Sequence, residues 1–312
     1  MSKRATREAF GATLVELADG GMDVVAVEAD LSKSTTTATF ADAYPERFFN
    51  AGIAEQNMID VAAGLAAAGK VAFTGSFAVF ATGRAYDQVR NTVCYSELDV
   101  KLAPTHSGIT VGPDGGSHQM IEDIALMRVL PGMRVLVPAD YHAACDAIRL
   151  AAITPGPFYI RLGRAAVPSV YDERFRFGLG KTYVVREGDD VTLAACGVMV
   201  QRALEAAALL AEQHISAEVL DVATIKPIDS DTIARSAAKT GAVVACEEHS
   251  IIGGLGSAVA EVLGERAPVP LTRVGVRDVF GTSGDPEELM AHFGLTADDV
   301  VKAAQDVLSR RL

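Results

Sequence analysis

The stretch Asn50-Ala51-Gly52-Ile53-Ala54-Glu55-Gln56-Asn57-Met58 lies at a junction between two kinds of sequence. The aromatic run Arg47-Phe48-Phe49 precedes it, and the alanine-rich segment Val61 to Gly69, which predicts a closely packed helix, follows it. An acid in the first turn of a helix usually only offsets the positive end of the helix dipole, worth about 0.3–1 kcal/mol when exposed. Glu55 has apolar sequence on both sides, so its interpretation depends on the rest of the chain.

Short apolar runs alternate with helical patterns through the first half of the chain. The run Val24-Val25-Ala26-Val27 ends at Glu28, which is typical of a strand buried on both faces. The hydroxyl-rich segment Ser32–Thr37 predicts a turn at the carboxyl end of that strand. The other strands expected in this half are Val71–Thr74, Val100–Ala103, Val135–Val137 and Phe158–Leu162. This alternation predicts an α/β fold with a doubly wound, mostly parallel sheet, whose ligands collect at the carboxyl ends of the strands.

The sequence changes character between residues 168 and 188, where aromatic and charged side chains precede Gly178 and Gly180. We expect this segment to be an extended connector. A second alternation follows, with strands expected at Val191–Ala195, Glu218–Val222, Val243–Cys246 and Thr272–Val276. We therefore predict two domains, an α/β domain over residues 1–167 and a smaller α/β domain over residues 189–312.

Composition and charge narrow the class of protein. Of 312 residues, 49% are hydrophobic and 22% are charged, so large cores can form. A net charge of -12 and a pI of about 5.0 argue against a nucleic acid or an anionic membrane as a partner. No signal peptide or run of about 18 apolar residues occurs, so we expect a cytoplasmic protein. Cys145, Cys196 and Cys246 lie in apolar runs and predict buried free thiols, and no metal-ligand spacing occurs.

The segment Pro104–Gln119 is the densest polar stretch and follows an expected strand. It contains His106, Asp114 and His118, separated by several Gly and Pro residues. Glycine lets the backbone approach a ligand closely, and histidine can transfer a proton near neutral pH. The pattern indicates hydrogen bonding to a hydroxyl-rich or carbonyl ligand, with a solvated surface loop as the alternative.

Aromatic and basic side chains after other expected strands suggest further contacts. Phe77 and Phe80 are three residues apart, so they share one helical face, either in the core or as a wall for a flat heterocycle. Arg161 and Arg164 lie at the end of the last strand of the first domain, and arginine is suited to bidentate phosphate binding. Gly253–Gly256 resembles a phosphate loop only weakly and predicts a tight strand-to-helix turn.

Taken together, these stretches resemble the C-terminal half of the transketolase family. They occur in the order of that family and extend over nearly the whole chain. The matching stretches are Glu28-Ala29-Asp30-Leu31, Gly52-Ile53-Ala54-Glu55-Gln56-Asn57, Phe77 with Phe80, His106 to Gln119, Leu162-Gly163-Arg164, Lys226-Pro227-Ile228 and Glu247-Glu248-His249 before Gly253-Gly254.

The resemblance implies a pyrimidine-binding domain for thiamine diphosphate, followed by a transketolase C-terminal domain. Glu55 would hydrogen-bond the pyrimidine of the cofactor and so activate it, as a protonated carboxyl in an apolar pocket. Phe77 and Phe80 would line that pocket. A third aromatic residue typical of transketolases is replaced by Gly83, and Tyr86 is the candidate to compensate for it.

The resemblance also implies a substrate site. His106 and His118 would contact the hydroxyl groups and carbonyl oxygen of a ketose donor, and Asp114 would read the stereochemistry of its hydroxyls. Ser34 and Arg164 would hold a substrate phosphate. With Glu55, the two histidines are the expected catalytic residues.

The diphosphate of the cofactor and its metal are bound in transketolases by a Gly-Asp-Gly…Asn motif on a preceding domain, and this sequence has no such motif. The chain therefore resembles the small subunit of a split transketolase. An N-terminal subunit would supply the diphosphate site and the ligands of Mg²⁺ or Ca²⁺, and none of the metal ligands would come from this chain. The expected assembly is an α2β2 heterotetramer, and the expected reaction moves a two-carbon ketol unit between sugar phosphates.

Three alternatives remain at the level of sequence. The run Arg84-Ala85-Tyr86-Asp87-Gln88 is similar to one in 1-deoxyxylulose-5-phosphate synthase, so the chain is alternatively the C-terminal part of such an enzyme. The β subunit of a 2-oxoacid dehydrogenase is the second alternative. His106 favours transketolase over both, because the synthase usually has Arg there and the dehydrogenase lacks the paired-histidine loop. A non-catalytic partner of a thiamine enzyme is the third alternative.

Overall fold

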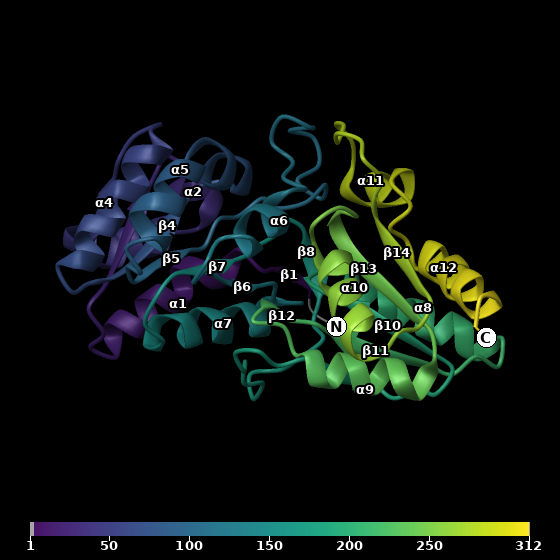
Figure 1. The fold of residues 1–312 in the computed structure, drawn as a ribbon. Coiled ribbons are helices and arrows are strands. Elements are labelled where there is room, and N and C mark those ends of the chain that lie inside the picture. Colours follow the sequence, from purple (N-terminus) through teal and green to yellow (C-terminus); the bar gives the residue numbers. More distant parts are fainter. Residues whose placement is uncertain (1–2, 312) are drawn as a thin grey trace.

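The computed structural model describes residues 3–311, in which two large β-sheets flanked by helices lie side by side (Figure 1). The N-terminal half builds six strands of a seven-stranded sheet, whose seventh strand comes from the C-terminal half, and the C-terminal half builds a five-stranded sheet. The predicted fold class is confirmed. Within residues 3–311, every helix is too short or too polar to cross a membrane.

The seven-stranded sheet has the order β12-β6-β7-β5-β4-β2-β3, and all its neighbours are parallel except β12 and β6. Its strands are β2 (Val24–Glu28), β3 (Phe48–Asn50), β4 (Val71–Gly75), β5 (Val100–Leu102), β6 (Arg134–Leu136), β7 (Phe158–Ile160) and β12 (Thr224–Lys226). Its helical segments are α1 (Glu8–Asp19), α2 (Ser32–Thr35), α3 (Ala38–Ala43), η1 (Pro45–Arg47), α4 (Glu55–Ala67), η2 (Val79–Arg84), α5 (Tyr86–Gln88), η3 (Val89–Cys94), α6 (Asp123–Arg128) and α7 (Tyr141–Ile153).

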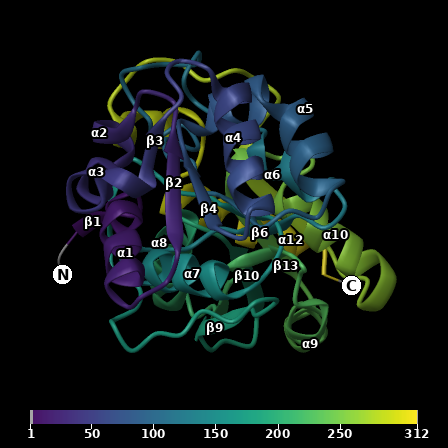
Figure 2. The same ribbon diagram turned by 90° about the vertical axis from the view of Figure 1, so that its left-hand side faces the viewer.

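Helices cover both faces of this sheet, which explains why its strands are continuous apolar runs. Every residue of β2 is buried, and its side chains alternate between two cores. Val24 and Ala26 face a core that includes α1 and α7, whereas Val25 and Val27 face a core that includes α4. Figure 2 shows α1 and α4 on opposite sides of β2.

The five-stranded sheet has the order β14-β13-β10-β11-β9 and is parallel except for β9. Its strands are β9 (Tyr183–Arg186), β10 (Val191–Ala195), β11 (Ala217–Asp221), β13 (Val243–Ser250) and β14 (Leu271–Val276). Its helices are α8 (Met199–Glu212), α9 (Ser230–Thr240), α10 (Leu255–Arg266), α11 (Pro286–His292) and α12 (Ala297–Ser309).

Two pairings tie distant parts of the chain together. β1 (Lys3–Ala5) pairs antiparallel with β8 (Ala166–Pro168), so the N-terminal segment lies beside the end of the first sheet. β12 leaves the C-terminal half and adds an antiparallel edge to β6. The Nζ atom of Lys226 then donates to the carbonyl oxygen of Arg128 at 2.9 Å. The two halves also share one continuous apolar core, in which α4 of the first and α10 of the second take part.

The nine expected strands are present, with bounds shifted by a few residues at most at either end. The structure adds strands that the apolar pattern did not predict. β9 lies inside the segment expected to be an extended connector, and its residues are half-buried or exposed, so they form no apolar run. The four cysteines are buried and free, as predicted for three of them.

Candidate active site

Glu55 is the first residue of α4, directly after the turn that follows β3. Gly52 takes a positive φ of 72° in this turn, and the side-chain oxygen of Asn50 accepts from its backbone N–H at 2.9 Å. The same oxygen accepts from the backbone N–H of Asp30 at 3.1 Å. These contacts set the point at which α4 begins. The side chain of Glu55 is only 1% exposed, so the carboxylate is buried at the positive end of the helix.

The partner of Glu55 is Arg84, which the sequence analysis did not assign to the site. Its Nη1 atom donates to Oε2 of Glu55 at 3.0 Å, and its side chain is 46% exposed. The guanidinium carbon also lies 4.3 Å from the ring centroid of Phe80. A planar group that donates to Glu55 and covers an aromatic ring is therefore already present in this chain.

Four rings form a cluster next to this pair. The centroids of Phe77 and Phe80 are 6.0 Å apart with nearly parallel planes. The ring of Phe77 also stacks on His106, with centroids 3.7 Å apart. His118 meets the face of Phe80 edge-on at 5.4 Å. Both aromatic residues after β4 and both histidines of the polar loop, which comprises Pro104–Gln119, thus lie together.

Tyr86 is the residue expected to compensate for the aromatic ring missing at Gly83. It is half-buried and packs against the core that includes α4. Among the ring pairs within residues 3–311, none joins Tyr86 to Phe77 or Phe80. In this chain the Phe80 ring is covered by the Arg84 guanidinium instead.

His106 is held in an uncommon backbone conformation at the start of the polar loop. Its φ is 60°, in the left-handed region that few residues other than glycine adopt and that is frequent at functional sites. Its side chain is buried, and Nδ1 lies 2.8 Å from Oγ1 of Thr105. Burial lowers the pKa of His106 to about 3, and the charges of Arg7, Arg164 and His118 lower it further. The imidazole is therefore neutral at physiological pH.

The rest of the polar loop places Asp114 and His118 nearer to solvent. Asp114 is exposed, and its Oδ2 atom lies 3.7 Å from Nη1 of Arg164. The same nitrogen of Arg164 donates to the carbonyl oxygen of Val111. Nδ1 of His118 lies 3.0 Å from the hydroxyl of Ser117. Asp114 is therefore accessible and His118 partly so, whereas His106 is buried.

Arg7 is a further residue of the site that sequence reasoning missed. Its Nη1 atom donates to the carbonyl oxygen of Ser34 at 2.9 Å. The charge of Arg164 contributes to lowering the pKa of Arg7, after burial, which places the two guanidinium groups near each other. Only the folded structure shows that Arg7 belongs here, because the pairing of β1 with β8 brings the N-terminal segment to Arg164. Arg7, Ser34 and Arg164 thus form a basic corner next to His106.

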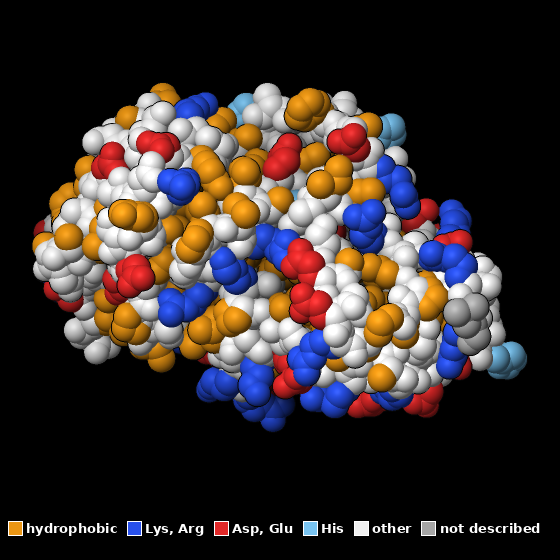
Figure 3. Space-filling view, in the orientation of Figure 1, with side chains coloured by type: hydrophobic (Ala, Val, Ile, Leu, Met, Phe, Trp, Pro, Cys, Tyr) orange, Lys and Arg blue, Asp and Glu red, His pale blue; other side chains and the backbone are white. Residues whose placement is uncertain are grey.

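Within residues 3–311, no group of three or more His, Cys, Asp or Glu side chains is placed to hold a metal ion. Lys, Arg, Asp and Glu side chains are interspersed with apolar ones on the face drawn in the space-filling view (Figure 3).

Comparisons with known proteins cover nearly the whole chain. The transketolase pyrimidine-binding domain matches residues 2–169, and the transketolase C-terminal domain matches residues 180–300. A 6-deoxy-6-sulfo-D-fructose transketolase subunit from Clostridium is 48% identical over 98% of this chain and 95% of its own length.

Two solved structures are also similar. A split gene transketolase, described as an inactive beta4 tetramer, is 52% identical with a TM-score of 0.92, and the match covers 100% of both chains. The transketolase from Leishmania mexicana is 25% identical with a TM-score of 0.82, and there the chain covers 46% of the neighbour. The chain belongs to the transketolase family and comprises its pyrimidine-binding and C-terminal domains.

Proposed function

We propose that this chain is the small subunit of a split, thiamine-diphosphate-dependent transketolase that transfers a two-carbon ketol unit between a ketose donor and an aldose acceptor. The observation that carries the proposal is the buried carboxylate of Glu55 beside the cluster of Phe77, Phe80, His106 and His118. A buried acid, an aromatic wall and two imidazoles at one place fit the activation of a flat cofactor and the handling of a ketose.

The residues present fit the pyrimidine of thiamine diphosphate. Arg84 already satisfies Glu55 and covers Phe80 with a planar group that donates hydrogen bonds, and an aminopyrimidine has the same two properties. In our proposal Glu55 holds a proton at Oε2 toward the pyrimidine, and Phe77 and Phe80 form the pocket wall. Tyr86 supports that wall through α5, which packs on α4. Bound thiamine diphosphate supplies the carbanion chemistry of the reaction.

His106 and His118 bind the donor sugar in this proposal. The neutral imidazole of His106 donates from one nitrogen and accepts at the other, so it can orient a hydroxyl or carbonyl oxygen without bringing in a charge. His118 is less buried and lies across the ring of Phe80. Asp114 accepts from a sugar hydroxyl near the mouth of the site, where it is exposed.

A basic corner made by Arg7 and Arg164, with Ser34 beside it, binds the anionic group of the substrate. Guanidinium groups bind phosphate and sulfonate oxygens with similar geometry. The Clostridium relative is named for a sulfonated sugar, so a sulfonate is a candidate beside a sugar phosphate of pentose phosphate metabolism.

The proposal includes a partner chain for the rest of the cofactor site. The chain covers about half of the Leishmania transketolase, and it has no Gly-Asp-Gly…Asn motif. An N-terminal subunit would bind the diphosphate and Mg²⁺ or Ca²⁺, and two copies of each subunit would form an α2β2 heterotetramer in the cytoplasm.

The proposal is tested by reconstitution. The purified chain is mixed with an N-terminal transketolase subunit from the same source, thiamine diphosphate and Mg²⁺, and ketol transfer is measured with ketose phosphates and sulfonated ketoses. We expect turnover only in the complete mixture. Robust turnover by this chain alone would contradict the split site, and no turnover with any ketose would contradict the function.

A further inference from the structure

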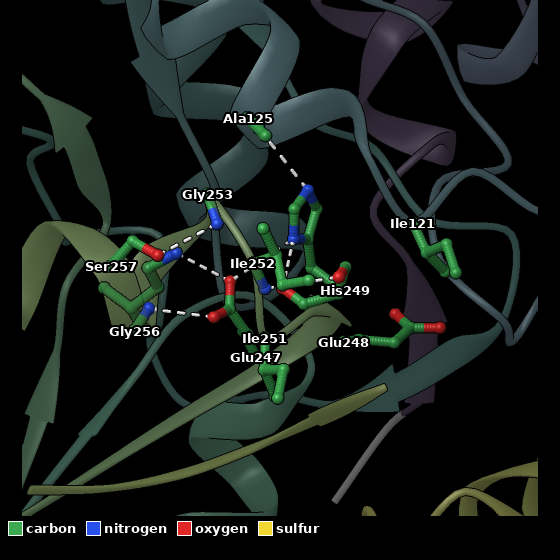
Figure 4. A network of polar contacts seen from close by, with 12 residues as sticks. Ile121, Ala125, Glu247, Glu248, His249, Ile251, Ile252, Gly253, Gly256 and Ser257 are labelled. Carbon is green, nitrogen blue, oxygen red and sulfur yellow. Dashed lines mark hydrogen bonds and ion pairs between the residues drawn. The ribbon is translucent and has the colours of Figure 1, made fainter. Parts of the chain in front are cut away.

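Three consecutive titratable side chains near the end of β13 have no assigned role. Glu247, Glu248 and His249 are 1%, 3% and 0% exposed, respectively. They belong to the C-terminal domain, yet Glu248 contacts the polar loop of the first domain, and His249 accepts from the backbone N–H of Ala125 in α6, as Figure 4 shows. Burying a carboxylate costs folding free energy unless hydrogen bonds or an opposite charge compensate for it, so the partners of these side chains indicate their roles.

The two glutamates point in opposite directions, as successive residues of a strand do. Glu247 faces its own domain, where its two oxygens accept from the backbone N–H groups of Leu255 and Gly256 at 2.6 and 2.8 Å. It therefore caps the N-terminus of α10, whose first N–H groups have no partner within the helix. Figure 4 shows the carboxylate of Glu248 directed away from that turn.

Glu248 instead contacts the polar loop that carries His106 and His118. Its Oε1 atom accepts from the backbone N–H of Thr110 at 2.6 Å. The carboxylate also fills the space next to Gly108, where a Cβ atom would clash with it. Gly108 has a φ of 77°, so both the space and the backbone conformation require glycine there. Glu248 thus supports the backbone two and four residues after His106.

The C-terminal domain holds the far end of the same loop. The Nε2 atom of Gln119 donates to the carbonyl oxygen of Thr282 at 2.8 Å. A Cβ atom at Gly115 would clash with Ser283, so the two loops are packed closely. The polar loop and the segment between β14 and α11 accordingly lie side by side (Figure 1).

We propose that Glu248 is a positioning residue, which fixes the shape of the loop between His106 and His118 from the C-terminal domain. It acts through the backbone of Gly108 and Thr110 and does not touch the substrate. The catalytic consequence rests on the proposed function, whereas the structural part stands on these contacts alone. The C-terminal domain thereby takes part in the site without supplying a side chain to it.

Glu247 provides a matched control. It is the same residue type, adjacent in the strand and equally buried, and it also accepts from backbone N–H groups. Burial raises the pKa of both carboxyl groups. The two differ in the element that each supports, and Oε2 of Glu247 also lies 3.6 Å from Nδ1 of His249.

The first experiment is hydrogen–deuterium exchange on the full chain alone, comparing wild type with Glu248→Ala, Glu248→Gln, Glu247→Ala and Glu247→Gln. We expect Glu248→Ala to speed exchange of peptides within residues 107–119 by about 10-fold, because the acceptor of a buried amide is lost. Glu248→Gln keeps an oxygen acceptor and should restore most of the protection. The Glu247 variants should speed exchange at the start of α10 and leave the loop unchanged, and Glu247→Gln covers the case in which Glu247→Ala fails to fold. Unchanged loop exchange in Glu248→Ala would overturn the proposal.

The second experiment measures ketol transfer by the same variants with the N-terminal subunit. We expect Glu248→Ala to lower kcat/KM for the ketose by about 10-fold, with the concentration of thiamine diphosphate for half-maximal activity unchanged. Equal losses in Glu247 and Glu248 variants would overturn a specific role for Glu248. If the wild-type mixture has no turnover, the proposed function fails, while the exchange experiment still decides whether Glu248 holds the loop.

Discussion

The two sheets of this chain share a parallel α/β architecture but differ at the carboxyl ends of their strands. In the first sheet, the segments after β4 and β5 carry Phe77 and His106, which stack on each other in a ring cluster whose other histidine, His118, is only half-buried. In the second sheet, the ends of β11 and β13 carry Asp221 and Glu247–His249, which are buried and bonded within the protein.

The difference shows that topology alone does not make a site. Parallel sheets gather polar groups at one edge, and ligands bind there only where those groups remain accessible. In the second sheet, the end of β13 contacts the first domain through Glu248 and Ser250, and Glu247 there accepts from the start of α10. In our proposal the catalytic residues belong to the first domain, and Glu248 of the second domain fixes the shape of the polar loop.

The largest expected effect is for Glu55, a buried acid in the candidate site, compared with a buried acid of the second sheet. Glu55→Gln should reduce ketol transfer by the mixed subunits by about 100-fold or more, the range for loss of a group that transfers or holds a proton. The isosteric change leaves the fold intact, which circular dichroism checks. Turnover is measured with saturating thiamine diphosphate and partner subunit.

Glu218 of β11 is the control from the second sheet. It is a buried acid that pairs with Lys239 on the outer side of the C-terminal domain. Glu218→Gln should leave turnover within about 2-fold of wild type, because Glu218 lies outside the candidate site and the amide keeps an oxygen that can accept from Lys239. Near-normal turnover of Glu55→Gln would remove the distinction between the two acids.

The basic corner gives the next largest effect. Arg164→Ala and Arg7→Ala should each raise KM for a phosphorylated or sulfonated ketose by about 10-fold, because a charge-assisted hydrogen bond contributes roughly 1.5–3 kcal/mol. KM for an uncharged ketose should change little. Steady-state kinetics with both kinds of ketose checks this, and equal increases would show that no anion is bound there.

The same comparison shows how much the sequence could predict. The strands β2, β4 and β10 were visible because burial on both faces requires continuous apolar runs. The strand β9 was not, because an antiparallel edge strand with exposed residues needs no such run. The short strand β12 was hidden as well, since its pairing with β6 joins segments far apart in the chain.

The candidate site divides in a similar way. His106, His118, Phe77 and Phe80 could be found because they lie in unusual local sequence, a glycine-rich polar loop and an aromatic pair, which also resembles a known family. Arg7 could not be found this way, because its local sequence is that of any surface arginine at a helix start. Only the pairing of β1 with β8 brings it to Arg164 and Ser34.

A smaller effect concerns pH and again contrasts the two sheets. Burial lowers the pKa of His106 to about 3 from its ordinary 6.5, whereas burial raises the pKa of Asp221 to about 7 from its ordinary 3.8. The unfolded chain therefore binds the His106 proton more tightly than the folded chain does. The free energy of unfolding consequently falls as pH falls from 6.5 toward 3. The folded chain, in contrast, binds the Asp221 proton more tightly than the unfolded chain does. The contribution of Asp221 to the free energy of unfolding is therefore lost as pH rises from 3.8 through 7.

Thermal unfolding between pH 4.5 and 8 tests both signs. His106→Gln should flatten the decrease in Tm on the acid side. Asp221→Asn should flatten the decrease between pH 5 and 7.5, by roughly 2–4 °C if about 1 kcal/mol is involved. Parallel curves for wild type and both variants would mean that neither group titrates in the folded chain as its burial indicates.

The smallest expected effect is at Arg84, whose guanidinium group contacts Glu55 and Phe80 in the candidate site of the first sheet. Arg84 has to leave Glu55 and Phe80 before a pyrimidine can take its place, and a partly exposed ion pair contributes about 0.2–1 kcal/mol. Arg84→Ala should therefore lower the concentration of thiamine diphosphate for half-maximal activity about 2- to 5-fold, with kcat nearly unchanged. Arg90, which is exposed and bonded to Asn91, is the matched control and should change neither quantity. A higher cofactor requirement in Arg84→Ala would instead show that Arg84 helps to bind the cofactor, and the carboxylate of Glu55 would then need its guanidinium in the active state.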